Sequence, residues 1–298
     1  MATPLTAARV LGALRGEGLT VHEVRDWRTH DRAASGNPWG PVHGVMIHHT
    51  VTRGTASSVA LCYDGHAALP GPLCHGVIDK EGHVHLVGHG RANHAGRGDR
   101  RVLDAVVAER AALPPDTVAD TDGNTHFYGF ECVNLGDGRD PWPEAQLLAI
   151  ERAAAALCRA HGWSHRSVIG HLEWQPGKVD PRGFSMEAMR GRVARRLAAP
   201  PVPAPDPAQG KPAAGYAAYP GEGFFCAGRR SEVIARMGRR LVAERCDRYG
   251  VTARPGPEWG EEHRQSYALW QRKLGFSGAD ADGIPGRVTW DRLRVPAS

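Results

Sequence analysis

The segment Gly170–Phe184 has the sequence GHLEWQPGKVDPRGF and brings a histidine, a lysine and an aspartate close together. Prolines and glycines interrupt it, so the pattern predicts a loop, and loops on a rigid scaffold often carry catalytic groups. His171 and Asp180 are suitable metal ligands, with Lys178 beside them. Because one imidazole and one carboxylate cannot hold a metal ion alone, we expect further ligands from another part of the chain.

A partner for this loop is found in the apolar run GVMIHHT, Gly44–Thr50, which predicts a strand. It contains His48 and His49, and because side chains alternate between faces along a strand, only one of them can point into a given site. Two imidazoles, one carboxylate and an open fourth position are typical of catalytic zinc. The residues alone leave a second interpretation open, in which the histidine is a hydrogen-bonded core residue and the later loop is ordinary surface.

Strand and helix patterns alternate through the first two thirds of the chain. Leu73–Val87 predicts a hairpin, and His126–Asn134 and the run SVIGH before the opening loop predict strands. Pro143–Gly162 is amphipathic, with proline at its start and glycine at its end, which predicts a helix. A basic helix is expected at Ser185–Leu197. This alternation predicts an α/β fold with a central mixed β-sheet flanked by helices.

A segment rich in proline and alanine, Ala198–Pro220, predicts a semi-extended linker. We therefore predict a catalytic domain at residues 1–197, a linker at 198–216 and a second domain at 217–298. Helical patterns follow the linker, and they predict a small, mainly helical module. These patterns cover Ser231–Tyr249, Gly260–Leu274 and Arg287–Arg294.

Composition limits the classes of function. The 298 residues are 41% hydrophobic and 23% charged, as in a soluble globular protein, and the net charge of +5 favours a polyanionic partner. Without lysine-rich runs, nucleic acid is the least supported partner. The N-terminal sequence lacks the apolar core of a signal peptide, and no apolar run approaches the roughly 20 residues that span a bilayer. We expect synthesis in a cytoplasm, no membrane insertion, and six cysteines present mainly as free thiols, with pairing of Cys226 and Cys246 left open.

Three motifs in order, VMIHHT, YGFECVN and GHLEWQPGKVDP, resemble the zinc-dependent N-acetylmuramoyl-L-alanine amidases of the peptidoglycan-recognition-protein fold, which include phage endolysins. The resemblance covers roughly residues 42–197. It implies Zn²⁺ bound by His48, His171 and Asp180. It also implies that Lys178 stabilises the oxyanion formed as water attacks the amide, and that Glu131 of YGFEC accepts a proton from that water.

One departure concerns a tyrosine that some family members carry before a strand histidine. Here Cys74 precedes His75, so the role of the phenol is either absent or taken by Glu131. The loop GRANHAG, Gly90–Gly96, is similar to a loop that lines the substrate cleft of related phage amidases. His75, Asn93 and His94 are therefore expected to contact the substrate.

The C-terminal region, with WQRKLG and DADGIPGRVTW, is similar to helical peptidoglycan-binding modules of actinobacterial phage endolysins. Trp259, Trp270 and Trp290 are candidates either for stacking on sugar rings or for the core. Together the resemblances imply a monomeric endolysin, made in the host cytoplasm without a signal peptide and acting on bacterial peptidoglycan after release. Two alternatives stay open: a recognition protein that binds peptidoglycan without cutting it, and a zinc peptidase that cuts within the stem peptide.

Overall fold

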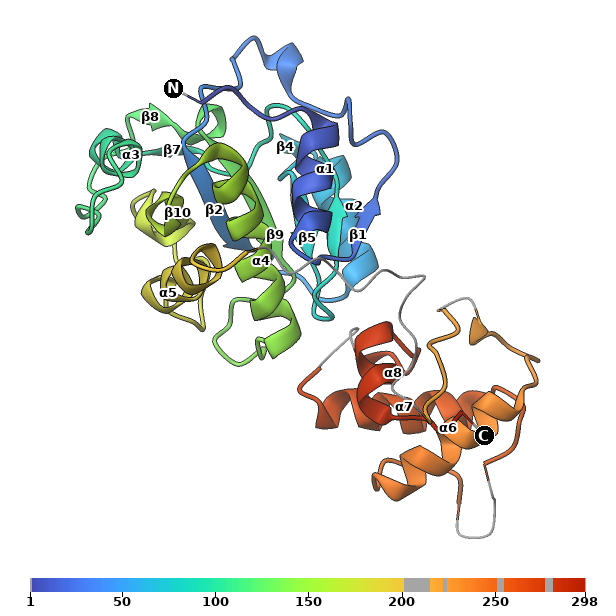
Figure 1. Cartoon of the computed structure of the whole chain (residues 1–298). Helices are drawn as coiled ribbons and strands as arrows, with labels where there is room; N and C mark the ends of the chain where they lie inside the picture. Colours follow the sequence, from blue (N-terminus) through green and yellow to red (C-terminus); the bar gives the residue numbers. More distant parts are fainter. Residues whose placement is uncertain (1, 201–214, 222–223, 251–254, 277–280, 298) are drawn as a thin grey trace. The chain divides into compact units, whose positions relative to one another are not determined.

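The chain forms two compact units, Met1–Ala204 and Pro205–Ser298. The structure is a computed structural model that describes residues 2–200, 215–221, 224–250, 255–276 and 281–297. Figure 1 shows both units, with an α/β arrangement in the first and helices in the second. Most of the predicted linker lies outside the described residues, so the domain limits at 197 and 216 stay predictions.

A six-stranded mixed sheet is the centre of the N-terminal unit, with strand order β1-β6-β5-β9-β2-β10. Only the β5–β6 hairpin is antiparallel, and the other neighbouring pairs are parallel. The strands are β1 Val21–Glu23, β2 Gly44–His49, β5 Gly76–Ile78, β6 Val84–Leu86, β9 Phe127–Cys132 and β10 Val168–Gly170. Because β2, β9 and β10 run parallel, their carboxyl ends meet at one edge of the sheet.

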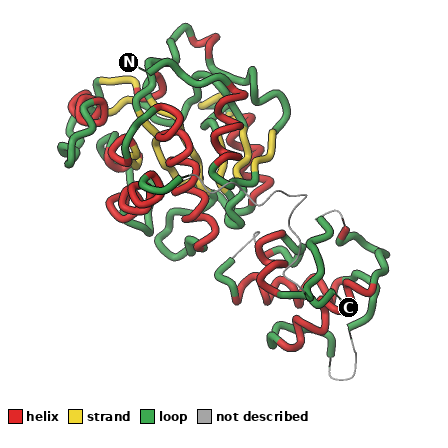
Figure 2. Tube along the Cα trace, viewed as in Figure 1, coloured by secondary structure: helices red, strands yellow, loops and turns green. Residues whose placement is uncertain are grey.

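Helices cover both faces of this sheet (Figures 1 and 2). Val45 and Ile47 of β2 share a buried cluster with residues of α1, α4 and α5, whereas Met46 packs with residues of α3. The helices are α1 Ala7–Gly16, α2 Thr55–Asp64, α3 Arg100–Val107, α4 Glu144–His161 and α5 Met186–Leu197. By alternation along β2, His48 lies on the same face as Met46. None of the described helices is long and apolar enough to cross a bilayer.

Several elements agree with the sequence-based predictions. α4 begins after Pro143 and ends at Gly162, whose left-handed backbone (φ 73°) lets its N–H bond the last carbonyls of the helix. The predicted hairpin is β5–β6, and the predicted strands at Gly44–Thr50 and His126–Asn134 are β2 and β9. The predicted α/β class with a mixed sheet flanked by helices is confirmed.

Short elements connect the sheet to the loops around it. Two small antiparallel ribbons are formed by β3 Gly65–His66 with β4 Leu69–Pro70, and by β7 Arg97–Gly98 with β8 Thr121–Asp122. Single turns of 3-10 helix lie at Ala33–Ser35, Gly123–Thr125, His165–Ser167 and His171–Glu173. The last of these follows β10 directly and opens the loop that carries Lys178 and Asp180.

The C-terminal unit is a small helical bundle of α6 Glu232–Ala243, α7 Glu261–Lys273 and α8 Arg287–Leu293. Trp259, Trp270 and Trp290 are all buried in its core cluster. Of the two roles considered for these tryptophans, the packing supports the core role. Cys246 is buried and Cys226 is exposed, and both are free thiols.

Candidate metal centre and active site

His48, His171 and Asp180 converge at the carboxyl edge of the parallel strands. Nδ1 of His48, Nδ1 of His171 and Oδ2 of Asp180 lie 3.0 Å from one another. All three residues are buried, with 1%, 4% and 9% of their surface exposed. Among the described residues, this is the one group of three or more histidine, cysteine or acidic side chains with such spacing. The same set was predicted from the motifs.

The backbone explains why these residues meet. β10 pairs with β2 in parallel, with Gly170 opposite Ile47, so the residues that follow, His171 and His48, lie next to each other at the strand ends. The loop then turns back, and the N–H of Leu172 donates to the carbonyl of Asp180 at 2.7 Å. Sequence-adjacent His49 points away and accepts a hydrogen bond from the backbone of Arg182. The preference for His48 over His49 therefore agrees with the geometry.

The charge state of the cluster suits cation binding. Burial lowers the pKa of His48 to about 4, against an opposing effect of Asp180, so its imidazole is neutral at neutral pH. Two imidazole nitrogens and one carboxylate oxygen are a donor set that fits zinc.

Glu131 lies beside this cluster on β9, directly opposite His48 in the parallel register. Its Oε2 is buried and has no hydrogen-bond partner among the described residues. Burial, followed by the charge of Asp180, raises the pKa of the Glu131 carboxyl to about 8. A carboxyl group that titrates near neutral pH and lies unpartnered beside a metal-type cluster is suited to proton transfer.

Lys178 is exposed on the loop between His171 and Asp180. Its backbone N–H donates to the carbonyl of Gln175 at 3.1 Å, which closes a turn in that loop. Its positive charge lowers the pKa of both His48 and Glu131, so the ammonium group acts electrostatically on the cluster. This position is compatible with a cation that stabilises developing negative charge.

Two polar residues contact the histidines on the side away from the cluster. Nε2 of His48 lies 3.1 Å from Nδ1 of His94, and Nε2 of His171 lies 3.2 Å from Oε1 of Gln175. Burial, followed by the charges of His48 and His75, lowers the pKa of His94 well below its usual value. Gln175 was not predicted as a site residue, although its spacing of four residues from His171 on a helical turn was a usable signal.

The predicted substrate contacts occupy different environments. His75 is 3% exposed, with Nε2 2.8 Å from the carbonyl of Gly90 and Nδ1 accepting the N–H of Gly129 at 2.9 Å. Asn93 is partly exposed and donates to the carbonyl of Pro70. His94 is 7% exposed and contacts His48. Contact of these three residues with substrate stays a prediction.

Cys74 occupies the position where some family members carry tyrosine. It is fully buried, and burial together with the neighbouring Cys62 raises the pKa of its thiol well above the usual value. A buried, protonated thiol is not a nucleophile. The structure therefore agrees with the interpretation of Cys74 as a small structural residue.

The domain is thus a sheet flanked by helices, with a His–His–Asp cluster of a metal-binding type at its carboxyl edge and Glu131, whose Oε2 is buried, beside it. Residues 38–183 match the family model described as N-acetylmuramoyl-L-alanine amidase. This match includes every residue of the cluster as well as Glu131 and Lys178. The part of the N-terminal unit that holds the cluster is therefore similar to this amidase family.

Solved structures similar to the chain include the N-acetylmuramoyl-L-alanine amidase LysC from Clostridium intestinale URNW. The identity is 14% and the TM-score 0.40, over 58% of this chain and 97% of LysC. The amidase AmiD from E. coli, solved with anhydro-N-acetylmuramic acid-L-Ala-D-gamma-Glu-L-Lys, is 16% identical over 87% of this chain and 89% of AmiD, with a TM-score of 0.40. PlyL is 13% identical over 62% of this chain and 99% of PlyL, with a TM-score of 0.41. No curated protein sequence matches the chain significantly.

Proposed function

We propose that the chain is a zinc-dependent N-acetylmuramoyl-L-alanine amidase of the endolysin kind. It would cleave the amide between the lactyl group of N-acetylmuramic acid and L-alanine in bacterial peptidoglycan. The observation that carries this proposal is the buried cluster of His48, His171 and Asp180 inside a domain that matches the amidase family. Bound there, zinc supplies a Lewis acid that makes water nucleophilic near neutral pH and polarises the amide carbonyl.

The remaining steps are assigned to residues of this chain. The Glu131 carboxylate accepts a proton as the water attacks, and the resulting carboxylic acid returns that proton to the leaving amine. A pKa of about 8 allows both protonation states near neutral pH. The Lys178 ammonium group stabilises the negative charge that develops on the carbonyl oxygen, an interaction that strengthens toward the transition state.

The decisive experiment is mass spectrometry of soluble products from purified peptidoglycan, with native protein and a His171→Ala variant in parallel. Stem peptides with a free L-alanine amine, released only by native protein after zinc loading, would support the amidase. Fragments cut inside the stem would instead identify a zinc peptidase. Binding without any soluble product would identify a recognition protein, a class that typically lacks the third ligand, whereas Asp180 is present here.

For the C-terminal unit we propose a role in wall binding. The limits are those expected from the sequence, a catalytic domain at 1–197, a linker at 198–216 and a wall-binding domain at 217–298. A monomer made in the cytoplasm would act on the wall after the membrane is breached. Linking a binding module to a catalytic module raises the local concentration of the enzyme on an insoluble substrate.

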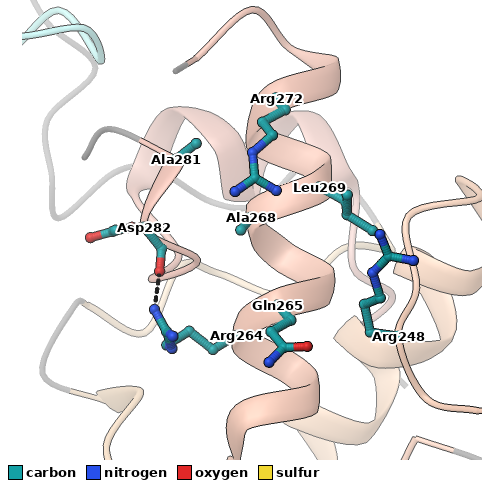
Figure 3. Close-up of a pocket in the computed structure, with 8 residues that line it drawn as sticks. All are labelled: Arg248, Arg264, Gln265, Ala268, Leu269, Arg272, Ala281 and Asp282. Carbon is teal, nitrogen blue, oxygen red and sulfur yellow. Dashed lines mark hydrogen bonds between the residues drawn. The ribbon is translucent and has the colours of Figure 1, made fainter. Parts of the chain in front are cut away.

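A hollow over α7 is the part of the C-terminal unit that favours this role (Figure 3). Gln265, Ala268, Leu269 and Arg272 follow one another at helical spacing along one face of α7, and Arg248 lies beside them. The hollow has a volume of about 420 Å³. Alanine and leucine side chains and three arginines line it together with Asp282, whose Oδ1 already accepts hydrogen bonds within the fold, so the depression suits a peptide that carries methyl groups and carboxylates.

The arginines of the hollow differ in their partners. Arg264 is paired with Glu261 at 2.7 Å and donates to the carbonyl of Asp282, so its charge is largely used within the fold. The guanidinium groups of Arg248 and Arg272 make no hydrogen bond or ion pair with any residue that the structure describes. We propose that these two groups bind carboxylates of the stem peptide.

A further inference from the structure

Hydrogen-bond partners contact the two imidazoles of the metal-type cluster on the side that faces away from Asp180. In both His48 and His171 it is Nδ1 that faces Asp180, and Nε2 that faces away from it. A neutral imidazole carries its single proton on one of these two nitrogens, and only the other can donate an electron pair to a metal. The groups that contact Nε2 therefore determine which nitrogen carries the proton. When the proton is on Nε2, Nδ1 has a free electron pair for a metal ion.

For His48 the deciding group is His94. Nε2 of His94 lies 3.1 Å from the carbonyl oxygen of Phe127, which can only accept, so the proton of neutral His94 resides on Nε2. Its Nδ1 is then an acceptor, 3.1 Å from Nε2 of His48. Nε2 of His48 must supply the proton of this contact, which leaves Nδ1 of His48 with a free electron pair directed at the cluster.

For His171 the deciding group is Gln175. Its Oε1 lies 3.2 Å from Nε2 of His171, and a carbonyl oxygen accepts but does not donate. The backbone N–H of Gln175 also donates to the carbonyl of His171 at 3.1 Å, which keeps the two residues on one turn. The same logic applies: the proton of His171 is held on Nε2, and Nδ1 is free.

The surrounding backbone is shaped to hold His94 against β9. The N–H groups of His94 and Ala95 both donate to Oδ1 of Asn124, at 2.9 and 2.7 Å. Residue 129 is glycine, and a Cβ built there would lie 2.4 Å from Nδ1 of His94. Only glycine at this position lets the His94 ring lie close enough to the strand to reach both Phe127 and His48.

We propose that His94 and Gln175 are positioning residues that fix both metal-facing histidines in the Nε2–H tautomer, so that each ligates through Nδ1. The inference rests on the metal site of the proposed function, but not on the reaction that the site catalyses. Partners of this kind also restrict ring rotation, and their removal typically lowers metal affinity by about 10–100-fold.

The test compares substitutions that keep or remove the acceptor while preserving size. His94→Asn and Gln175→Glu keep an oxygen where Nδ1 and Oε1 now lie, whereas His94→Leu and Gln175→Met do not. Zinc affinity of the full chain is measured by competition with a chromophoric chelator. We expect about 10–100-fold weaker binding in the Leu and Met variants, and affinity within about threefold of native protein in the Asn and Glu variants.

His263→Ala is the matched control, because it removes an equally buried imidazole in the C-terminal unit, where its ring packs against Tyr249 and Trp259. Its zinc affinity should equal that of native protein even if its stability falls. Equal affinity in all four test variants, or equal loss with and without the acceptor, would overturn the proposal. If native protein bound no zinc, the metal site of the proposed function would fail instead. Zinc binding without amidase activity would leave the positioning role intact.

Discussion

At the scale of single residues, the environment of the Glu131 side chain indicates a chemical rather than a structural role. Its neighbours Phe130 and Cys132 are buried apolar residues of β9, yet its own Oε2 is buried and has no hydrogen-bond partner in the part of the chain that the structure describes. A structural carboxylate in such a place would be paired, because an unpaired buried charge is costly. Glu131→Gln keeps the shape and removes the ability to accept a proton. We expect kcat to fall by about 10²–10⁴-fold.

The measurement for Glu131→Gln combines steady-state kinetics on a soluble muropeptide with metal analysis and thermal unfolding. The variant should keep its zinc and should unfold at or above the native temperature, since a buried ionisable group has been replaced by a neutral one. Activity within threefold of native protein would assign proton transfer to another group. Loss of zinc together with activity would instead make Glu131 part of the metal centre.

His75 gives a prediction about pH. Burial, followed by the charge of His89, lowers the pKa of His75 to about 3, compared with about 6.5 in an unfolded chain. As pH falls below 6.5, the unfolded state binds a proton that the folded state does not take up until about pH 3. The free energy of unfolding should therefore fall with decreasing pH, by at most about 1.4 kcal/mol per pH unit for this group.

His75→Asn isolates this contribution, because an amide oxygen can accept the N–H of Gly129 as Nδ1 now does but cannot titrate. Urea unfolding of both proteins between pH 4 and 8 is the measurement, and the other histidines cancel in the difference. Native protein should lose stability relative to the variant as pH decreases below 6.5. Curves that stay parallel would show that His75 takes up its proton equally in both states.

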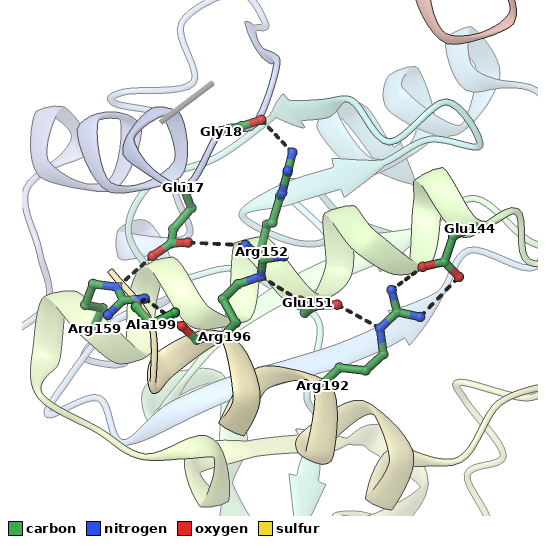
Figure 4. Close-up of polar contacts among 9 residues, drawn as sticks. All are labelled: Glu17, Gly18, Glu144, Glu151, Arg152, Arg159, Arg192, Arg196 and Ala199. Atoms are coloured by element: carbon green, nitrogen blue, oxygen red, sulfur yellow. Dashed lines mark hydrogen bonds and ion pairs between the residues drawn. The ribbon is translucent and has the colours of Figure 1, made fainter. Parts of the chain in front are cut away.

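At the scale of elements, three helices on one face of the sheet are tied together by ion pairs (Figure 4). Glu151 of α4 accepts from Arg192 and Arg196 of α5, at 2.7 and 2.6 Å. Glu17, directly after α1, accepts from Arg159 of α4 at 2.7 Å. Glu17 and Glu151 are 2% and 8% exposed, so these charges are desolvated and depend on one another.

Glu151→Ala should therefore cost more than the loss of a surface ion pair. It removes the acceptor of the Nε–H groups of Arg192 and Arg196, although Arg192 keeps its pair with Glu144, and we expect a loss of about 1–3 kcal/mol in the free energy of unfolding. Asp104→Ala is the control, since Asp104 pairs with Arg100 on α3 where both side chains are more than half exposed. That change should cost less than about 0.5 kcal/mol. Similar losses in the two variants would mean that burial of the network adds nothing.

The elements also show what the sequence could predict. α4 was predicted to within a residue because its signals are local, a proline before it and a glycine after it. α3 was not predicted. Its capping residue Asp99 is held by the backbone N–H groups of Thr117 and Val118, and its apolar residues pack against the sheet. Its own residues also carry a local signal that the sequence-based prediction did not use, since Asp99 caps the helix and Val102, Leu103 and Val106 recur at helical spacing.

The candidate site likewise contains residues that the sequence predicted and a contact that it did not. His48, His171 and Asp180 were predicted because their residue types and motifs are chemically specific, and the parallel strands bring them together. The contact of His94 with His48 was not predicted, because it depends on how close a loop approaches β9. That approach depends on Gly129 in β9, and no sequence pattern near His94 indicates it.

At the scale of the whole molecule, the chain combines two units with separate cores, a metal-type centre in one and an arginine-lined hollow in the other. Attachment to an insoluble wall and cleavage of soluble fragments should then respond to different substitutions. A defect in the C-terminal unit should reduce action on intact wall and leave cleavage of a soluble muropeptide unchanged, because only the former depends on local concentration.

The charge-reversed double variant Arg248→Glu/Arg272→Glu tests this separation. Its control, Arg239→Glu/Arg292→Glu, makes the same change in net charge at exposed arginines outside the hollow. In sedimentation of the full chain with purified wall at 0.15 M salt, we expect at least about tenfold weaker binding for the first variant. The control should lose at most about twofold, because long-range attraction is screened at this ionic strength. If both variants lose binding equally, net charge rather than the hollow holds the wall. If neither does, the binding surface lies elsewhere in the C-terminal unit.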